Sequence, residues 1–230
     1  MATSAGSSVG ICLRPKSLRR AVELDPSNVA SHRHLGHLLS QRGRPAEATT
    51  SMARARELDP LDSLTWALSA QVAFQGRDLT AATAFARRAI ALAPQLWIGC
   101  IQLAQAYDAA GEPNVALEAL ADAERLADGN SKVPSLRGYV LARMGRTAAA
   151  RVVAASLTAP SPARYVPPYA AALVYAGLGE REAMFDELER AFGANDVHLM
   201  YLPVDPKWDP YRTDPRFASL LARCRFDVSR

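Results

Sequence analysis

Three evenly spaced prolines constrain the fold of this chain more than any other feature. Pro26, Pro60 and Pro94 are 34 residues apart, and each follows a helix-like run of apolar and charged residues. The first two close the same four-residue motif, ELDP. A period of this length predicts an array of stacked units, because one short unit cannot bury its apolar faces alone and must pack against its neighbours.

The pattern continues in phase through five units, which begin at Val29, Ser63, Trp97, Ser131 and Tyr165. Small residues recur at positions 8, 20 and 27 of these units, and larger apolar or aromatic residues recur at positions 4, 7, 11 and 24. Small side chains let two helices approach closely, and the larger ones fill the space between them. Each unit is therefore predicted to be a hairpin of two helices.

The third unit illustrates the local signals for such a hairpin. Leu103, Ala104 and Tyr107 lie on one face of a predicted helix. Gly111 is expected to end that helix, because glycine adopts the left-handed conformation without steric cost. Pro113 can begin the second helix, where its missing N–H is not needed.

These positions resemble the tetratricopeptide repeat, a 34-residue helix–turn–helix unit with the signature W-x2-L-G-x2-Y, A-x3-F and P. The resemblance covers about Ser17–Phe192. It implies an all-α, right-handed superhelix, an α-solenoid of about five helical hairpins with a concave side.

Three segments are expected. Residues 1–16, rich in Gly, Ser and Ala, are predicted to be a flexible tail, and residues 17–192 the repeat array, which starts with half a unit. Residues 193–230 are predicted to be a capping hairpin. There Asp205, Asp209 and Asp214 each precede a proline, an arrangement in which the aspartate can cap the helix or turn that the proline begins.

The composition limits the cellular compartments and the classes of partner that suit this protein. The 27 basic residues are interleaved with 23 acidic ones, and the net charge of +4 favours a solvated mixed-charge surface over direct nucleic-acid binding. Cys12, Cys100 and Cys224 are few and far apart, which suits a reducing, cytoplasmic setting. No apolar run approaches the length of a membrane span.

The sequence offers no convincing catalytic, cofactor or metal site. His34 and His37 could share a metal ion on one helix face, but no cysteine or carboxylate lies nearby in sequence. Gly177–Ala183 lacks the lysine and Ser/Thr of a phosphate-binding loop. A turn between two repeat helices explains this stretch better, so no enzyme activity is expected.

The resemblance implies that positions 2, 5, 6, 9, 12 and 13 of each first helix line the concave groove. An apolar centre between basic ends would suit a helix or an extended peptide with apolar anchors and acidic flanks. The alternative is a groove filled by the protein's own neighbouring helix, or by nothing. The predicted groove residues are Arg33, His34, His37, Leu64, Leu68, Gln71, Phe74, Ile98, Ile101, Gln102, Gln105, Lys132, Tyr139 and Arg143.

Two functional hypotheses follow. The first is a protein-interaction scaffold that binds a peptide or helix of a partner protein in this groove. The second arises because the stretch from Tyr165 to Phe192 and the tail after it resemble the C-terminal repeats of large bacterial regulators, which carry a winged-helix, cyclase or kinase domain upstream. That resemblance implies a sensory or oligomerising part of such a regulator, with a homo-oligomer as one outcome.

Overall fold

A computed structural model describes residues 15–127, 129–159 and 165–224 of the chain. Every regular element within these ranges is a helix, as the repeat pattern predicted. Pro15 and Lys16 belong to the first helix, and the rest of the predicted tail lies outside the described residues. No helix in the described part of the chain is long and apolar enough to cross a membrane.

Consecutive helices pair into five hairpins: α2 with α3, α4 with α5, α6 with α7, α8 with α9, and α10 with α11. The helices are α1 (Pro15–Leu24), α2 (Val29–Gln41), α3 (Pro45–Leu58), α4 (Ser63–Gln75), α5 (Leu79–Leu92), α6 (Trp97–Ala109), α7 (Pro113–Leu126), α8 (Lys132–Arg143), α9 (Thr147–Thr158), α10 (Pro168–Leu178), α11 (Arg181–Gly193) and α12 (Pro215–Arg223). The 3₁₀-helices η1 (Val197–Tyr201) and η2 (Pro206–Tyr211) lie between α11 and α12.

The predicted local signals set the helix boundaries. Gly111 has a φ of 84° after α6, and Pro113 opens α7. The side chain of Asp62 caps α4 by accepting a hydrogen bond from the Leu64 N–H. Turns of this kind are encoded within each unit, which is why a period in the sequence becomes a period in the fold.

Close approach between helices depends on the small residues of the repeat. Ala48 and Ala55 of α3 are fully buried. A Cβ atom on Gly138 of α8 would lie 2.7 Å from the Cγ2 atom of Val174 in α10, so only glycine allows this packing distance. Buried apolar clusters accordingly occur from the first hairpin to the last.

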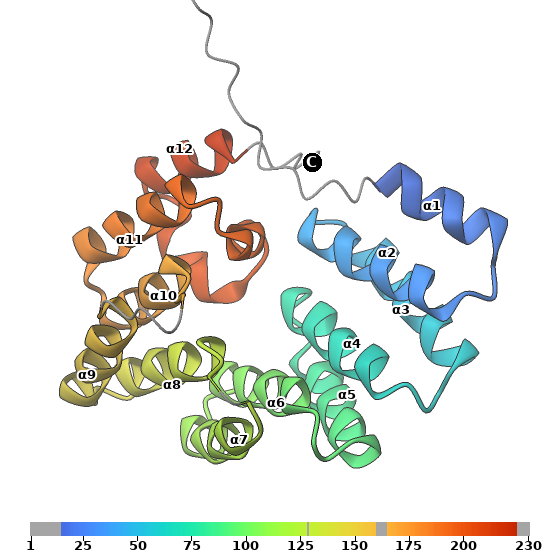
Figure 1. Ribbon diagram of the computed structural model, residues 1–230, viewed down its shortest axis with the longest axis horizontal. Helices are drawn as coiled ribbons and strands as arrows, with labels where there is room; N and C mark the ends of the chain where they lie inside the picture. Colours follow the sequence, from blue (N-terminus) through green and yellow to red (C-terminus); the bar gives the residue numbers. More distant parts are fainter. Residues whose placement is uncertain (1–14, 128, 160–164, 225–230) are drawn as a thin grey trace, which may run out of the picture.

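The helices follow one another around an arc that has α1 and α12 at its two ends (Figure 1). Residues 197–211, which include η1 and η2 and are called the inner segment here, return to the inside of this arc. Trp208 of the inner segment and Phe217 of α12 are fully buried and join the core of the last hairpins. The inner segment thus packs on the inner side of the array.

The aspartates before proline have two different roles. Asp205 caps η2 and Asp214 caps α12, each accepting a backbone N–H two residues later. Asp209 lies inside η2, where its carboxylate pairs with Arg77 and Arg212. The capping prediction is therefore confirmed for two of the three aspartates and wrong for Asp209, whose partner Arg77 lies in a distant repeat.

Candidate functional site

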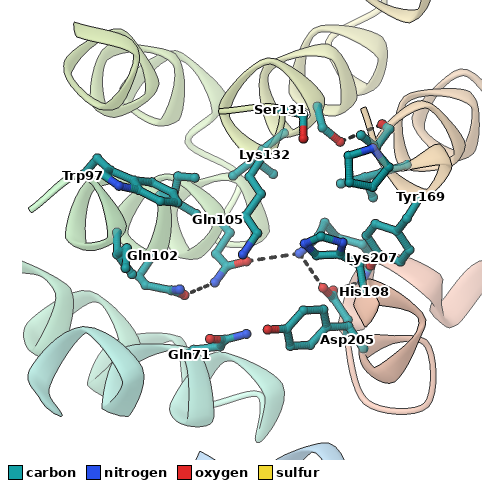
Figure 2. Close-up of a pocket in the computed structure, with 18 of the residues that line it drawn as sticks. Gln71, Trp97, Gln102, Gln105, Ser131, Lys132, Tyr169, His198, Asp205 and Lys207 are labelled. Carbon is teal, nitrogen blue, oxygen red and sulfur yellow. Dashed lines mark hydrogen bonds and ion pairs between the residues drawn. The ribbon is translucent and has the colours of Figure 1, made fainter. Parts of the chain in front are cut away.

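A pocket of about 280 Å³ lies between the inner face of the array and the inner segment (Figure 2). Helices α2, α4, α6, α8 and α10 contribute its walls on one side, and the inner segment contributes them on the other. The lining residues are His37, Leu68, Gln71, Trp97, Ile98, Ile101, Gln102, Gln105, Ser131, Lys132, Ser135, Leu136, Pro167, Tyr169, Ala170, Leu173, His198, Tyr201, Asp205 and Lys207.

Lys207 links the inner segment to the repeats. Its Nζ atom lies 2.8 Å from Asp205 Oδ2 and donates a hydrogen bond of 3.1 Å to Gln105 Oε1. The ammonium also lies 4.6 Å from the ring centre of Phe74, within cation–π range. These three partners allow the positive charge to be buried. The carboxylate and the aromatic ring attract the ammonium, and the amide oxygen accepts a hydrogen bond from it. Lys207 therefore closes one side of the pocket.

A second connection joins Arg77 to the inner segment. Both Asp209 carboxylate oxygens accept from Arg77 Nη2, at 2.9 and 2.8 Å, and the Val204 carbonyl accepts from Nη1 at 3.1 Å. Arg77 and Asp209 are both largely exposed, so solvent weakens this pair. The connection fixes the position of the inner segment more than it stabilises the fold.

Aromatic side chains anchor the inner segment to α10. Trp208 Nε1 donates a 2.9 Å hydrogen bond to the Tyr169 hydroxyl, and the two rings meet edge to face. The His198 ring stacks on Tyr169, and its Nδ1 atom lies 2.7 Å from Asp196 Oδ1. Burial alone would raise the pKa of the Asp196 carboxyl, but hydrogen bonds from His198 and from the Tyr169 N–H lower it below its ordinary value.

Two pocket residues carry polar groups that form no hydrogen bond within the described ranges. Lys132 opens α8 and extends into the pocket, yet its ammonium makes no ion pair or hydrogen bond within the described ranges. Burial of the ammonium among protein atoms lowers the pKa of Lys132, and the Asp196 charge opposes this effect. Trp97, the first residue of α6, is half-buried: its side chain packs against the core, and its indole N–H has no hydrogen-bond partner in the described ranges.

The structure brings most of the predicted groove residues together. Eight of them line the pocket: His37, Leu68, Gln71, Ile98, Ile101, Gln102, Gln105 and Lys132. Six do not. Among those six, Arg33 pairs with Asp62, Arg143 pairs with Asp108, His34 is exposed and Leu64 is half-buried.

The other two, Phe74 and Tyr139, are buried and do not line the pocket, which differs from their predicted place in the groove. Phe74 is 2% exposed, between repeat side chains and the Lys207 ammonium. Burial raises the pKa of Tyr139 to about 12, and its ring belongs to the main core. Ile101 and the two glutamines of α6 are also buried, although they reach the pocket.

The sequence reasoning missed three groups of lining residues. Trp97, Ser131 and Pro167 lie at positions 1 or 3 of their units, outside the groove register. Ser135, Leu136, Tyr169, Ala170 and Leu173 occupy groove positions 5, 6 and 9 of the fourth and fifth units, so the same register extended along the chain would have found them. The third group comes from the inner segment. Nothing periodic marks His198, Tyr201, Asp205 or Lys207, because their position depends on contacts with distant repeats.

The histidines of α2 have separate environments. His32 is buried and its Nε2 atom donates to the Pro26 carbonyl at 3.0 Å, whereas His37 Nε2 lies 3.3 Å from Gln71 Oε1. Burial lowers the pKa of His37 to about 4, which makes its imidazole neutral at pH 7. No group of three or more potential metal-ligating residues occurs in the described part of the chain.

Comparisons with known proteins address the fold. No family model and no curated protein matches the sequence. Among solved structures, TTC0263, a thermophilic TPR protein of Thermus thermophilus, is 22% identical over 85% of this chain and 100% of its own, with a TM-score of 0.62. The chain has the fold of a tetratricopeptide repeat (TPR) array.

Two further structures support this TPR fold. YrrB, described as a TPR protein with an unusual peptide-binding site, is 20% identical, and the match covers 83% of this chain and 98% of that one, with a TM-score of 0.50. The APC/C hetero-tetramer Cut9–Hcn1 gives 16% identity over 92% of this chain and 46% of its own, with a TM-score of 0.63. At these identities the likeness concerns the fold alone.

Proposed function

We propose that this TPR array is a protein-interaction scaffold that binds a segment of a partner protein on its concave face. The observation that carries the proposal is the row of half-buried apolar side chains on successive first helices. Leu68 of α4 and Ile98 of α6 line the pocket and keep part of their surface accessible, and Leu64, one helical turn before Leu68, is also half-buried. Apolar side chains at the edge of a pocket are suitable contacts for the anchors of a partner.

The inner segment limits where the partner can lie. It covers Phe74 and Gln105, so a partner segment contacts the array from the side of α2 and α4, where His34 is exposed. YrrB, a TPR protein with an unusual peptide-binding site, supports the use of this fold to bind a peptide segment. The scaffold hypothesis therefore stands with a smaller groove than the sequence suggested.

Site-directed photo-cross-linking tests the proposal. A photo-reactive amino acid replaces Leu68 in one variant and Leu61 in a control, since Leu61 is an exposed apolar residue in the turn before α4. We expect one protein from the native lysate to cross-link at position 68 and not at 61. The cross-linked segment, made as a peptide, should then bind the purified chain. Equal cross-linking at both positions, or a peptide that does not bind, would refute the assignment of the groove.

The second hypothesis, a sensory or oligomerising part of a bacterial regulator, stays a prediction. It requires an effector domain in the same reading frame. Sequencing the transcript upstream of the Met1 codon tests it directly. An in-frame winged-helix, cyclase or kinase domain would support it, and a stop codon immediately upstream would count against it.

A further inference from the structure

We propose that the pocket binds a small aromatic carboxylate, a free ligand separate from the protein partner. This inference goes beyond the scaffold function. It rests on the size of the pocket, on the wall that the inner segment adds to it, and on two lining side chains with no hydrogen-bond partner in the described part of the chain. These are the Trp97 indole and the Lys132 ammonium.

The volume of the pocket is closer to that of a small-molecule site than to that of a folded peptide segment. The cavity measures about 280 Å³. One turn of an α-helix, about 5.4 Å long and 10–12 Å across, occupies on the order of 500 Å³. Pockets for drug-sized molecules start at about 300 Å³. The pocket therefore suits a ligand of one or two rings better than a helical turn.

Contacts across the pocket block a chain that would pass through it. Tyr201, Asp205 and Lys207 form the wall opposite the repeats, and the hydrogen bond from Lys207 to Gln105 ties that wall to α6. An extended peptide along the concave face would have to displace this wall. A small free ligand needs no such movement.

The polar groups of the pocket are mostly committed to one another. Asp205 pairs with Lys207, and Asp196 accepts hydrogen bonds from His198 and from a backbone N–H. Gln105 donates to Gln102 and accepts from Lys207. Lys132 is the cation left without an ion pair among the described lining residues, so the charge that would complement it is negative.

The apolar walls near Lys132 indicate the chemistry of the uncharged part of the ligand. Trp97, Ile98, Ile101, Leu136 and Leu173 supply apolar surface. An aromatic ring that stacks on the Trp97 indole would gain the offset or edge-on contact that aromatic pairs favour. A carboxylate gives a charge-assisted hydrogen bond to an ammonium. A ring joined to a carboxylate by a short link satisfies both groups within the available volume.

Calorimetry with matched probes tests the proposal on the full-length chain. Phenylacetate is the acid, and phenylacetamide is the neutral probe of nearly the same shape. We expect the wild type to bind the acid at least about tenfold more tightly than the amide, because only the acid offers a charged acceptor. Equal affinity for the two probes, or no heat of binding for the acid at millimolar concentration, would overturn the proposal without any mutation.

Variants then assign the binding to the pocket. Lys132→Met should weaken phenylacetate binding about tenfold or more, whereas Lys16→Met, at an exposed lysine of α1, should leave it unchanged. Binding should also change the tryptophan fluorescence. That change should vanish in Trp97→Phe and persist in Trp66→Phe. An unaffected Lys132→Met variant would place the acid elsewhere and refute the site. A fluorescence change of full size in Trp97→Phe would show that the acid does not contact Trp97, which would also refute the proposal.

The two proposals fail separately. If phenylacetate does not bind and a partner segment still cross-links at Leu68 and binds as a peptide, the scaffold function stands and the ligand pocket is refuted. If phenylacetate binds as expected and no partner cross-links, the ligand pocket stands alone.

Discussion

Replacement of Trp208 by alanine should lower the free energy of unfolding of the C-terminal part of the array more than any substitution at its exposed ion pairs. Trp208 is 0% exposed and contacts Tyr169, Tyr211 and Phe217 at ring-centre distances of 5.5, 6.3 and 6.1 Å. Its indole N–H is bonded to the Tyr169 hydroxyl. The substitution therefore removes a large buried ring and leaves a cavity between α10 and α12.

The expected loss is about 3–5 kcal/mol, which is typical of a Trp→Ala change in a packed core. That range already includes the lost aromatic contacts and hydrogen bond, which should not be added again. The Arg77–Asp209 pair also holds the inner segment, but its side chains are 47% and 43% exposed. A pair this exposed contributes about 0.2–1 kcal/mol. Burial of Trp208 is thus the larger effect by several fold.

Trp66→Ala is the matched comparison. The Trp66 ring packs 5.6 Å from Phe85 and its N–H donates to the Pro60 carbonyl, but the side chain is only half-buried. We expect roughly half of the 1.5–3 kcal/mol that full burial of a large side chain provides. Urea unfolding followed by far-ultraviolet circular dichroism measures both variants. A Trp66→Ala variant as unstable as Trp208→Ala would refute the assignment of Trp208 as the main anchor of the inner segment.

Three further predictions test the packing and electrostatics. Asp209→Asn should lower the free energy of unfolding by at most about 1 kcal/mol, and the loss should shrink in 1 M NaCl, as paired urea titrations would reveal. Gly138→Ala should cost about 1–3 kcal/mol through overpacking against α10, whereas Gly193→Ala, where an added Cβ meets nothing within 4 Å, should be neutral or stabilising in the same thermal unfolding assay. Burial lowers the pKa of His37 from 6.5 to about 4, so the unfolded chain binds more protons between these values. Stability should therefore fall as the pH drops from 6.5 towards 4, and a His37→Gln variant that keeps the same slope would contradict this explanation.

The repeat array could be predicted because its signals are local. Pro113 and Gly111 determine where helices begin and end within one unit, and Asp62 caps the first helix of another. The same spacing of small residues, such as Ala48, determines which faces meet. A period in the sequence is therefore enough to predict both the hairpins and their stacking.

The burial of Phe74 could not be predicted in this way. The groove register correctly places Phe74 on a first helix, but it assumes that solvent or a partner covers that helix. In the structure Lys207, far along the chain and in a segment without periodicity, covers it instead. The alternative that the protein fills part of its own groove was open from the sequence, and the contact between Lys207 and Gln105 supports it.

One departure from the repeat was nevertheless a usable signal. Position 15 carries glycine in the other four units, but in the second unit it is Arg77, which keeps the left-handed φ of 68°. A non-glycine residue in that conformation costs roughly 1–2 kcal/mol, and the contacts with Val204 and Asp209 offset part of this cost.

The two effects can be separated by two substitutions. Arg77→Gly loses the contacts and also relieves the backbone, so its stability should stay close to that of the wild type. Arg77→Ala loses the contacts and keeps the strain, so it should be less stable than Arg77→Gly by about 1 kcal/mol. Urea titration of the two variants measures the difference. If Arg77→Ala proved as stable as Arg77→Gly, the backbone at this position would be unstrained, and the arginine would need no compensating contact with the inner segment.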